Sequence, residues 1–200
     1  KPTTSELELF FDFLAQIRHR TLIFSGNHEM QTKTHSILTD LKGEITRCNP
    51  NIEVITTCTF TSPHTGEPIF DVIDYCDINK HIEPKSNIAF THVRGSIEPH
   101  VKPEVDLTKF KEYRYVFAGD LHSFQNSQLN IVYPGSPLST SFHRNKTPDS
   151  THGMVLIDVC TSMWEWIDLG HLPQLVKVSV SDPKDMIQTA RDFTMYEING

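Results

Sequence analysis

Apolar and polar positions along the chain predict an alternation of helices and strands. Residues 3–20 carry apolar side chains at helical spacing, which predicts an amphipathic helix. Ser5 and Glu8 have the spacing of a capping box near its start. The expected apolar face of this helix consists of Leu7, Phe10, Phe11, Leu14 and Ile17.

The rest of the chain reads as one more long helix followed by many short strands. A second helix is expected over residues 34–46, with Ile37, Leu38, Leu41 and Ile45 on one side, and a short helix over 106–111. Short apolar runs predict strands at 21–25, 52–58, 68–75, 86–91, 113–118, 129–133, 153–159 and 163–169. The expected fold class is therefore mixed α/β (α+β), with a β-rich second half.

The last thirty residues have a separate signature. An apolar run over 172–180 predicts a strand, and Asp182 followed by Pro183 has the composition of a helix start, which predicts a helix to about residue 193. This βα unit is interpreted as the start of a second domain, with boundaries at 1–170 and 171–200. A final βα pair of the first domain is the alternative.

Composition places the chain among globular proteins. Its 200 residues, 38% of them hydrophobic and 22% charged, suffice for one sizeable core. Neither a signal peptide nor an apolar run of about 18 residues is found, so no membrane association is expected. Lys1 and the last residues are interpreted as the ends of a segment cut from a longer protein. Four cysteines without a Cys-x-x-Cys pair predict reduced, mostly buried thiols of a cytoplasmic protein.

The net charge of −7 argues against a non-specific nucleic-acid binder, which usually has a basic surface. It remains compatible with a metal-dependent phosphoesterase, because bound divalent ions supply positive charge locally.

Three of the predicted strands end in polar residues that commonly bind metals. Asn27 and His28 follow the strand at 21–25, His92 follows 86–91, and Asp120 and His122 follow 113–118. A lone histidine at a strand end is more often a hydrogen-bonded loop residue than a ligand. Ligands of open α/β sheets nevertheless bind beyond the carboxyl ends of the strands, and imidazole, carboxylate and amide oxygen suit manganese, iron or zinc. Three such strand ends together therefore predict a metal site.

These motifs also resemble a known family. Ser-Gly-Asn-His-Glu, Phe-Thr-His-Val-Arg-Gly and Ala-Gly-Asp-Leu-His-Ser, in that order, are similar to motifs of the calcineurin-like metallophosphoesterases. The following Tyr-Pro-Gly-Ser-Pro resembles the SbcD-type nuclease subunit of DNA double-strand-break processing complexes, including bacteriophage recombination nucleases. The resemblance covers about residues 20–140. It implies a two-sheet β-sandwich flanked by helices, with two divalent ions, manganese or alternatively magnesium, at its rim.

The resemblance assigns a role to each matching residue. His28 would be the catalytic histidine that contacts the scissile phosphate, Asn27 and His92 would bind the second metal, and His122 would bind the first. The family has Gly-His-x-His where this chain has Gly-Asp-Leu-His, so Asp120 would replace a histidine on the second metal. The family's first two motifs, Asp-x-His and Gly-Asp-x-x-Asp, are not in the sequence. They are expected before Lys1, and the 200-residue chain by itself is expected to be inactive.

The implied function is a subunit of a DNA repair or recombination nuclease, which hydrolyses phosphodiester bonds by two-metal-ion catalysis. Its implied partners are DNA, an SbcC-like ATPase and a second copy of the nuclease subunit, and residues 171–200 would begin a DNA-binding cap domain. Two alternatives stay open: a metallophosphatase acting on nucleotides or phosphoproteins, and a non-catalytic scaffold on the same fold. The substitution at Asp120 favours the scaffold weakly, whereas the presence of His28 argues against it.

Overall fold

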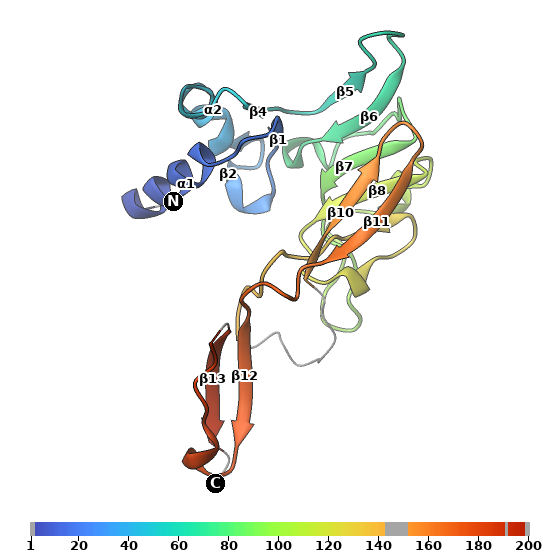
Figure 1. Ribbon diagram of the computed structural model, residues 1–200. Helices are drawn as coiled ribbons and strands as arrows, with labels where there is room; N and C mark the ends of the chain where they lie inside the picture. The colour runs from blue at the N-terminus through green and yellow to red at the C-terminus, as the bar shows by residue number, and fades with distance from the viewer. Residues whose placement is uncertain (1–2, 143–151, 191, 199–200) are drawn as a thin grey trace.

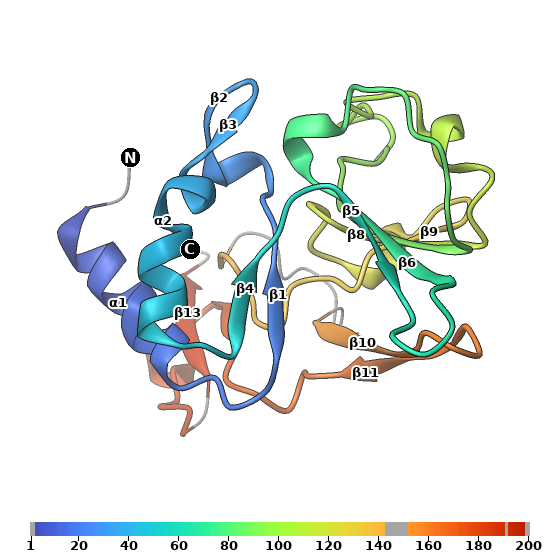
Figure 2. The same cartoon turned by 90° about the horizontal axis from the view of Figure 1, so that it is seen from above.

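The computed structural model describes residues 3–142, 152–190 and 192–198, which form an α+β fold with two α-helices and several small sheets (Figure 1). The predicted fold class is confirmed. Figure 2 shows a helical part, with α1, α2, β1 and β4, beside a part built on a larger sheet.

The helical part forms around a two-stranded parallel sheet. Strand β1 (Thr21–Ile23) pairs with β4 (Ile52–Val54), and helices α1 (Thr4–Ala15) and α2 (Ile37–Cys48) contribute the other apolar side chains. Their shared core contains Leu14, Leu38, Ile45, Ile52 and Val54, with Phe10, Phe11, Ile17, Ile23 and Leu41 at its margin. Between β1 and α2 lie a short 3₁₀-helix (Asn27–Glu29) and the hairpin of β2 (Met30–Thr32) and β3 (His35–Ser36).

Two details of the first helix differ from the prediction. The capping box is formed by Thr3 and Glu6, so the predicted pair of Ser5 and Glu8 is wrong, and the helix ends at Ala15 instead of continuing to residue 20. Thr3 precedes the first helical residue, where its hydroxyl accepts from the Glu6 amide, and this hydrogen bond places the cap two residues before Ser5.

The larger sheet has the order β5-β6-β7-β8-β9. Its strands are β5 (Cys58–Thr61), β6 (Pro68–Ile73), β7 (Ile88–His92), β8 (Tyr115–Gly119) and β9 (Ile131–Val132), with β5 antiparallel to β6 and the other pairs parallel. The predicted strand over 52–58 is therefore two strands, β4 and β5, which belong to different sheets.

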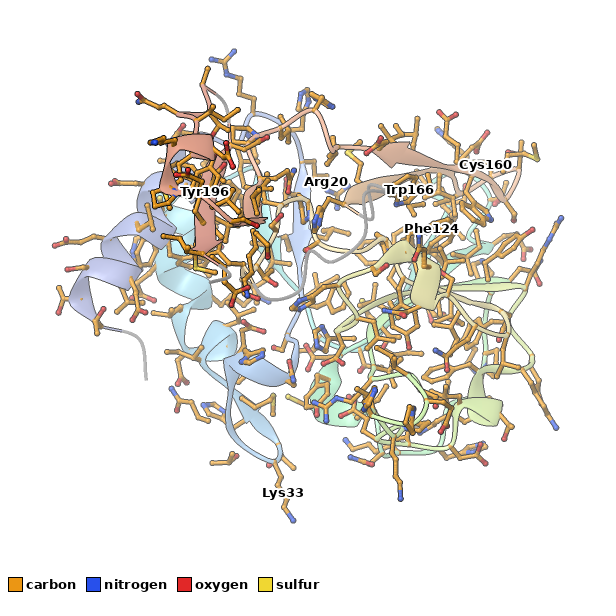
Figure 3. The ribbon with its side chains drawn as sticks, turned by 90° about the horizontal axis from the view of Figure 1, so that it is seen from below. Arg20, Lys33, Phe124, Cys160, Trp166 and Tyr196 are labelled. Carbon is orange, nitrogen blue, oxygen red and sulfur yellow. The ribbon has the colours of Figure 1, made fainter. Side chains whose placement is uncertain are left out.

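Both faces of this sheet are apolar, as expected for largely parallel strands covered on two sides. One face packs against the loop that carries the 3₁₀-helix at Leu107–Phe110, with Phe110 and Tyr113 buried in that core. The other face carries Phe90 and Phe117 and packs against the hairpin of β10 (Gly153–Asp158) and β11 (Met163–Asp168). Trp166 of β11 stacks on Phe124, with ring centroids 4.9 Å apart (Figure 3).

The C-terminal segment differs most from the prediction. Strand β12 (Leu175–Val180) is confirmed, and the Asp182 side chain accepts from the Lys184 amide as a helix cap would. The helix stops after one 3₁₀ turn (Pro183–Asp185), so the predicted helix to residue 193 is wrong. Residues 181–190 are all exposed, so a longer helix here would not be stabilised by packing against an apolar surface. The chain instead returns as β13 (Phe193–Ile198), parallel to β12, and the pair projects from the rest of the protein (Figure 1).

The four cysteines are free thiols, but two of them, Cys48 and Cys160, are exposed, so the prediction of mostly buried thiols is wrong. Among the described residues, no helix has the length and apolar character needed to cross a membrane.

Candidate metal-binding and catalytic site

The loop after β1 is fixed by hydrogen bonds to neighbouring elements. The Ser25 amide donates to the buried carboxylate of Asp74 at 3.0 Å, which ties the end of β1 to the end of β6. The Ser25 hydroxyl also lies 2.6 Å from the Ser36 hydroxyl. The Gly26 amide donates to the Glu29 carboxylate at 2.9 Å and closes the turn that begins at Asn27. Glu29 therefore shapes the loop, and Asn27 lies at its start.

His92 is the last residue of β7, and two glycines make room for its ring. A Cβ atom on Gly26 would lie 2.8 Å from His92 Nδ1, and one on Gly119 would lie 2.6 Å from the same atom. Real Cβ atoms do not approach so closely, so both positions require glycine while the imidazole keeps this place. The Tyr75 ring packs edge-on against it with centroids 5.8 Å apart, and the Tyr75 hydroxyl donates to Glu104 at 2.6 Å.

Asp120 follows β8 in a strained conformation. Its φ of +102° lies in a region that residues with a side chain rarely adopt, and such strain typically costs about 1–3 kcal/mol. One carboxylate oxygen accepts from Asn27 Nδ2 at 3.3 Å and the other from Arg94 Nε at 3.3 Å. Burial acts to raise the pKa of Asp120, but His92 and the Arg94 guanidinium outweigh it and hold that pKa below its ordinary value.

Three of the five predicted site residues meet at one point. His92 Nε2 lies 3.0 Å from Asn27 Oδ1 and 3.5 Å from Asp120 Oδ1. Strands β7 and β8 are parallel neighbours with His92 opposite Gly119, so their carboxyl ends bring His92 and Asp120 together. Asn27 reaches them from β1, which belongs to a separate sheet. The cluster thus lies where the two sheets meet.

The other two predicted residues line a cleft next to this cluster. His28 is exposed on the 3₁₀ turn, and His122 Nδ1 lies 3.1 Å from the Thr140 hydroxyl. Both border a cleft of about 850 Å³ that Asn27 and Asp120 also line. The structure therefore places His28 and His122 near the cluster without adding them to its hydrogen-bonded core.

Several residues of this cleft were not predicted from the sequence, among them Arg94 and His152. A sequence signal for Arg94 existed, because it stands two positions after His92 in the motif Phe-Thr-His-Val-Arg-Gly. For His152 the sequence offers no signal. Its ring nitrogens lie 3.3 Å from the Ser136 carbonyl oxygen and 3.2 Å from the Ser139 hydroxyl, contacts set by the fold.

The Tyr-Pro-Gly-Ser-Pro segment, residues 133–137, contacts the backbone next to His92. Tyr133 is fully buried, and its hydroxyl donates to the Val93 carbonyl at 3.1 Å, one residue after His92. The Pro134 carbonyl accepts from Trp166 Nε1 at 2.9 Å. This segment therefore connects the loop after β7 to the β10–β11 hairpin.

The donor atoms of the cluster fit a divalent cation in kind. The Asn27 amide oxygen lies 3.0 Å and an Asp120 carboxylate oxygen 3.5 Å from the His92 imidazole nitrogen, while the Asn27 amide nitrogen donates to Asp120 at 3.3 Å. The glycine-lined space around His92 fixes its ring. Across residues 3–142, 152–190 and 192–198, no three His, Cys, Asp or Glu side chains are grouped so that they could hold a metal. A metal site here would therefore depend on the Asn27 amide, and these three side chains would serve one ion.

A phage protein is similar to this chain over its whole length. No family model matches the chain. A crystal structure aligns with a TM-score of 0.49 and 15% identity, over 83% of this chain and 72% of its own, and this likeness is too weak to carry an argument. The chain is 43% identical over 205 residues to a protein of Escherichia phage T5 described as "Probable exonuclease subunit 1". That similarity extends over the whole of this chain and 61% of the length of the phage T5 protein.

Proposed function

We propose that this chain is part of a metal-dependent DNA nuclease subunit of the calcineurin-like, SbcD-type class. The observation that carries the proposal is the meeting of Asn27, His92 and Asp120 beside a cleft lined by His28 and His122. Each residue stands in a motif that resembles the corresponding motif of that class. The name of the phage T5 relative supports a nuclease over a phosphatase or a scaffold.

In this proposal Asn27, His92 and Asp120 hold one divalent ion, manganese or magnesium, and His122 belongs to the shell of a second. Two such ions, when bound, would lower the pKa of a water and stabilise negative charge on the phosphodiester. The fixed loop positions of the three donors keep their atoms in place before the ion binds, which lowers the entropic cost of binding.

His28 is proposed to act on the substrate directly. Its side chain is exposed at the edge of the cleft, and within the described part of the chain no hydrogen bond joins it to Asn27, His92 or Asp120. An imidazole at that place can hydrogen-bond a phosphate oxygen and supply a proton to the departing oxygen near neutral pH. His28 therefore differs from His92, whose ring is enclosed by glycines.

The proposal extends to partners. The word "subunit" in the name of the phage T5 protein supports an assembly with another protein, which we propose to be an SbcC-like ATPase. A second copy of the nuclease subunit and the use of residues 171–200 as the start of a DNA-binding cap belong to the same proposal. The projecting β12–β13 pair is compatible with such a separate unit.

The decisive experiment is a nuclease assay on the full-length protein with its partner subunit, with and without added manganese. We expect metal-dependent cleavage of DNA by the wild-type protein and loss of this cleavage in His28→Ala. Lys33→Ala, a change at the tip of the β2–β3 hairpin (Figure 3), should leave the cleavage rate unchanged. Cleavage of DNA at full rate by His28→Ala would refute the proposal. Hydrolysis of nucleotides or phosphoproteins by a wild-type protein that does not cleave DNA would refute it as well.

A further inference from the structure

Arg94 lies beside the cluster with only part of its guanidinium occupied. Its Nε donates to Asp120 Oδ2 at 3.3 Å, and its side chain is 40% exposed and lines the cleft. Among the described residues, no side chain is hydrogen-bonded to its two terminal nitrogens. A guanidinium held at Nε keeps its two terminal nitrogens available as parallel donors, and Arg94 lines the cleft.

The backbone that carries Arg94 is held firmly. The Arg94 amide donates to Glu104 Oε1 at 2.7 Å, and the Ser96 amide donates to Gln128 Oε1 at 2.9 Å. Gly95 between them is tightly enclosed, because a Cβ there would lie 2.6 Å from Gln128 Nε2. Arg94 is thus positioned before any ligand arrives, which reduces the entropy lost on binding.

The charge of the cleft is opposite to that of the chain. The protein has a net charge of −7, yet the residues lining the cleft include Arg94 and Lys102 and a single carboxylate, Asp120, which is already paired with Arg94. The described part of the cleft also contains four imidazoles, at His28, His100, His122 and His152. A locally cationic cleft on an acidic protein is suited to an anionic ligand.

We infer that Arg94 and Lys102 bind phosphates of the DNA strand in the cleft, Arg94 through both terminal nitrogens and Lys102 as a single charge. Arginine matches two phosphate oxygens with its planar fork, whereas lysine provides a point charge. This inference rests on the proposed function and adds to it the residues that hold the strand. Asp120 then has a second task, since it fixes the Nε side of the guanidinium.

A purely structural role for Arg94 makes a different prediction. If Arg94 only neutralised Asp120, Arg94→Lys would retain most of that charge and DNA binding would stay near its original level. If Arg94 binds a phosphate through its fork, Arg94→Lys recovers only part of the binding lost in Arg94→Ala.

The test measures binding of a fluorescently labelled DNA duplex to the full-length protein over a series of salt concentrations. Each phosphate contact contributes about 0.9 to the slope of log K against log salt concentration. Arg94→Ala and Lys102→Ala are each expected to make that slope less steep by about 0.9, which corresponds to roughly 5–10-fold weaker binding at 0.1 M salt. Arg20→Ala and Lys111→Ala are the matched controls, because both residues are exposed and neither lines the cleft.

Lys102→Ala keeps the test valid if Arg94→Ala disturbs folding, since Lys102 is exposed and bonds no side chain in the described part of the chain. Unchanged slopes for both variants, or full recovery of binding in Arg94→Lys, would overturn the inference. In that case wild-type cleavage of DNA would persist, so the proposed function would stand. Failure of the wild-type protein to cleave DNA would refute the proposed function instead.

Discussion

The imidazole of His92 lies 3.0 Å from the side-chain oxygen of Asn27, although 65 positions separate the two residues. His92 ends strand β7, whereas Asn27 lies in the loop after β1, a strand of another sheet. Asp120 joins them from a third loop. Three segments that are distant in the sequence therefore contribute one residue each to the cluster.

His28 and His92 are expected to differ in their effects on metal content. In the full-length protein, His28→Ala should abolish cleavage and leave the bound metal near its normal amount, because His28 is outside the cluster. His92→Ala should lower both, since it removes a donor atom. Metal content is measured by elemental analysis after dialysis, and equal metal loss in the two variants would make His28 a ligand.

A methyl group at Gly26 should disturb the site without touching the substrate. Its Cβ would lie 2.8 Å from His92 Nδ1, so Gly26→Ala must displace the imidazole, and metal affinity is expected to fall by about 10–100-fold.

Gly43→Ala provides the control for this substitution. Gly43 lies in α2, where a Cβ would meet only Arg47 Nη1 at 3.7 Å. This change should stabilise the protein by about 0.5–1 kcal/mol and leave metal affinity unchanged. Calorimetric titration with manganese compares the two, and equal affinities would contradict the crowding around His92.

The strained backbone at Asp120 predicts an unusual order of stabilities. Asp120→Ala and Asp120→Gly both remove the carboxylate that Asn27 and Arg94 contact, and both should lose activity by at least about 10-fold. Glycine alone relieves the strain at φ +102°, so the glycine variant should be more stable by about 1 kcal/mol. Urea unfolding measures this difference, and a more stable alanine variant would argue against strain.

Asp120→His should change the metal preference. A carboxylate is a harder ligand than an imidazole, so the native site should favour manganese or magnesium over zinc. The variant is expected to keep its activity with manganese while it binds zinc or cobalt more tightly. If zinc affinity does not change, Asp120 is not a ligand, and its contact with Arg94 is its main role.

The thiols should react at very different rates. Burial, followed by the hydrogen bond and charge of Asp74, raises the pKa of Cys76 to about 11, so the thiol stays protonated at neutral pH. Its reactive thiolate appears only as the pH approaches that value. At pH 8, alkylation of Cys76 should be about tenfold or more slower than that of the exposed Cys48 and Cys160. Mass spectrometry of the labelled peptides gives the three rates.

Elements that depend on local pattern could be predicted from the amino-acid sequence. Helical spacing identified α1 and α2, and short apolar runs identified most strands, because periodicity reflects which side of an element is buried. The strand-end positions of Asn27, His92 and Asp120 were also predictable, since each lies within three positions of an apolar run. Local signals failed after Asp182, where the cap formed but no buried surface supported a helix and parallel pairing with β12 prevailed.

Which of these residues touch depends on how distant segments pack in three dimensions. The register of β7 against β8 places His92 opposite Gly119, and the hydrogen bond from Ser25 to Asp74 brings the loop with Asn27 to the same point. The pairing of Arg94 with Asp120 and the space for the His92 ring between two glycines depend on contacts between distant segments. Such contacts are set by packing and by hydrogen bonds across the fold, and no repeat or spacing within one segment encodes them.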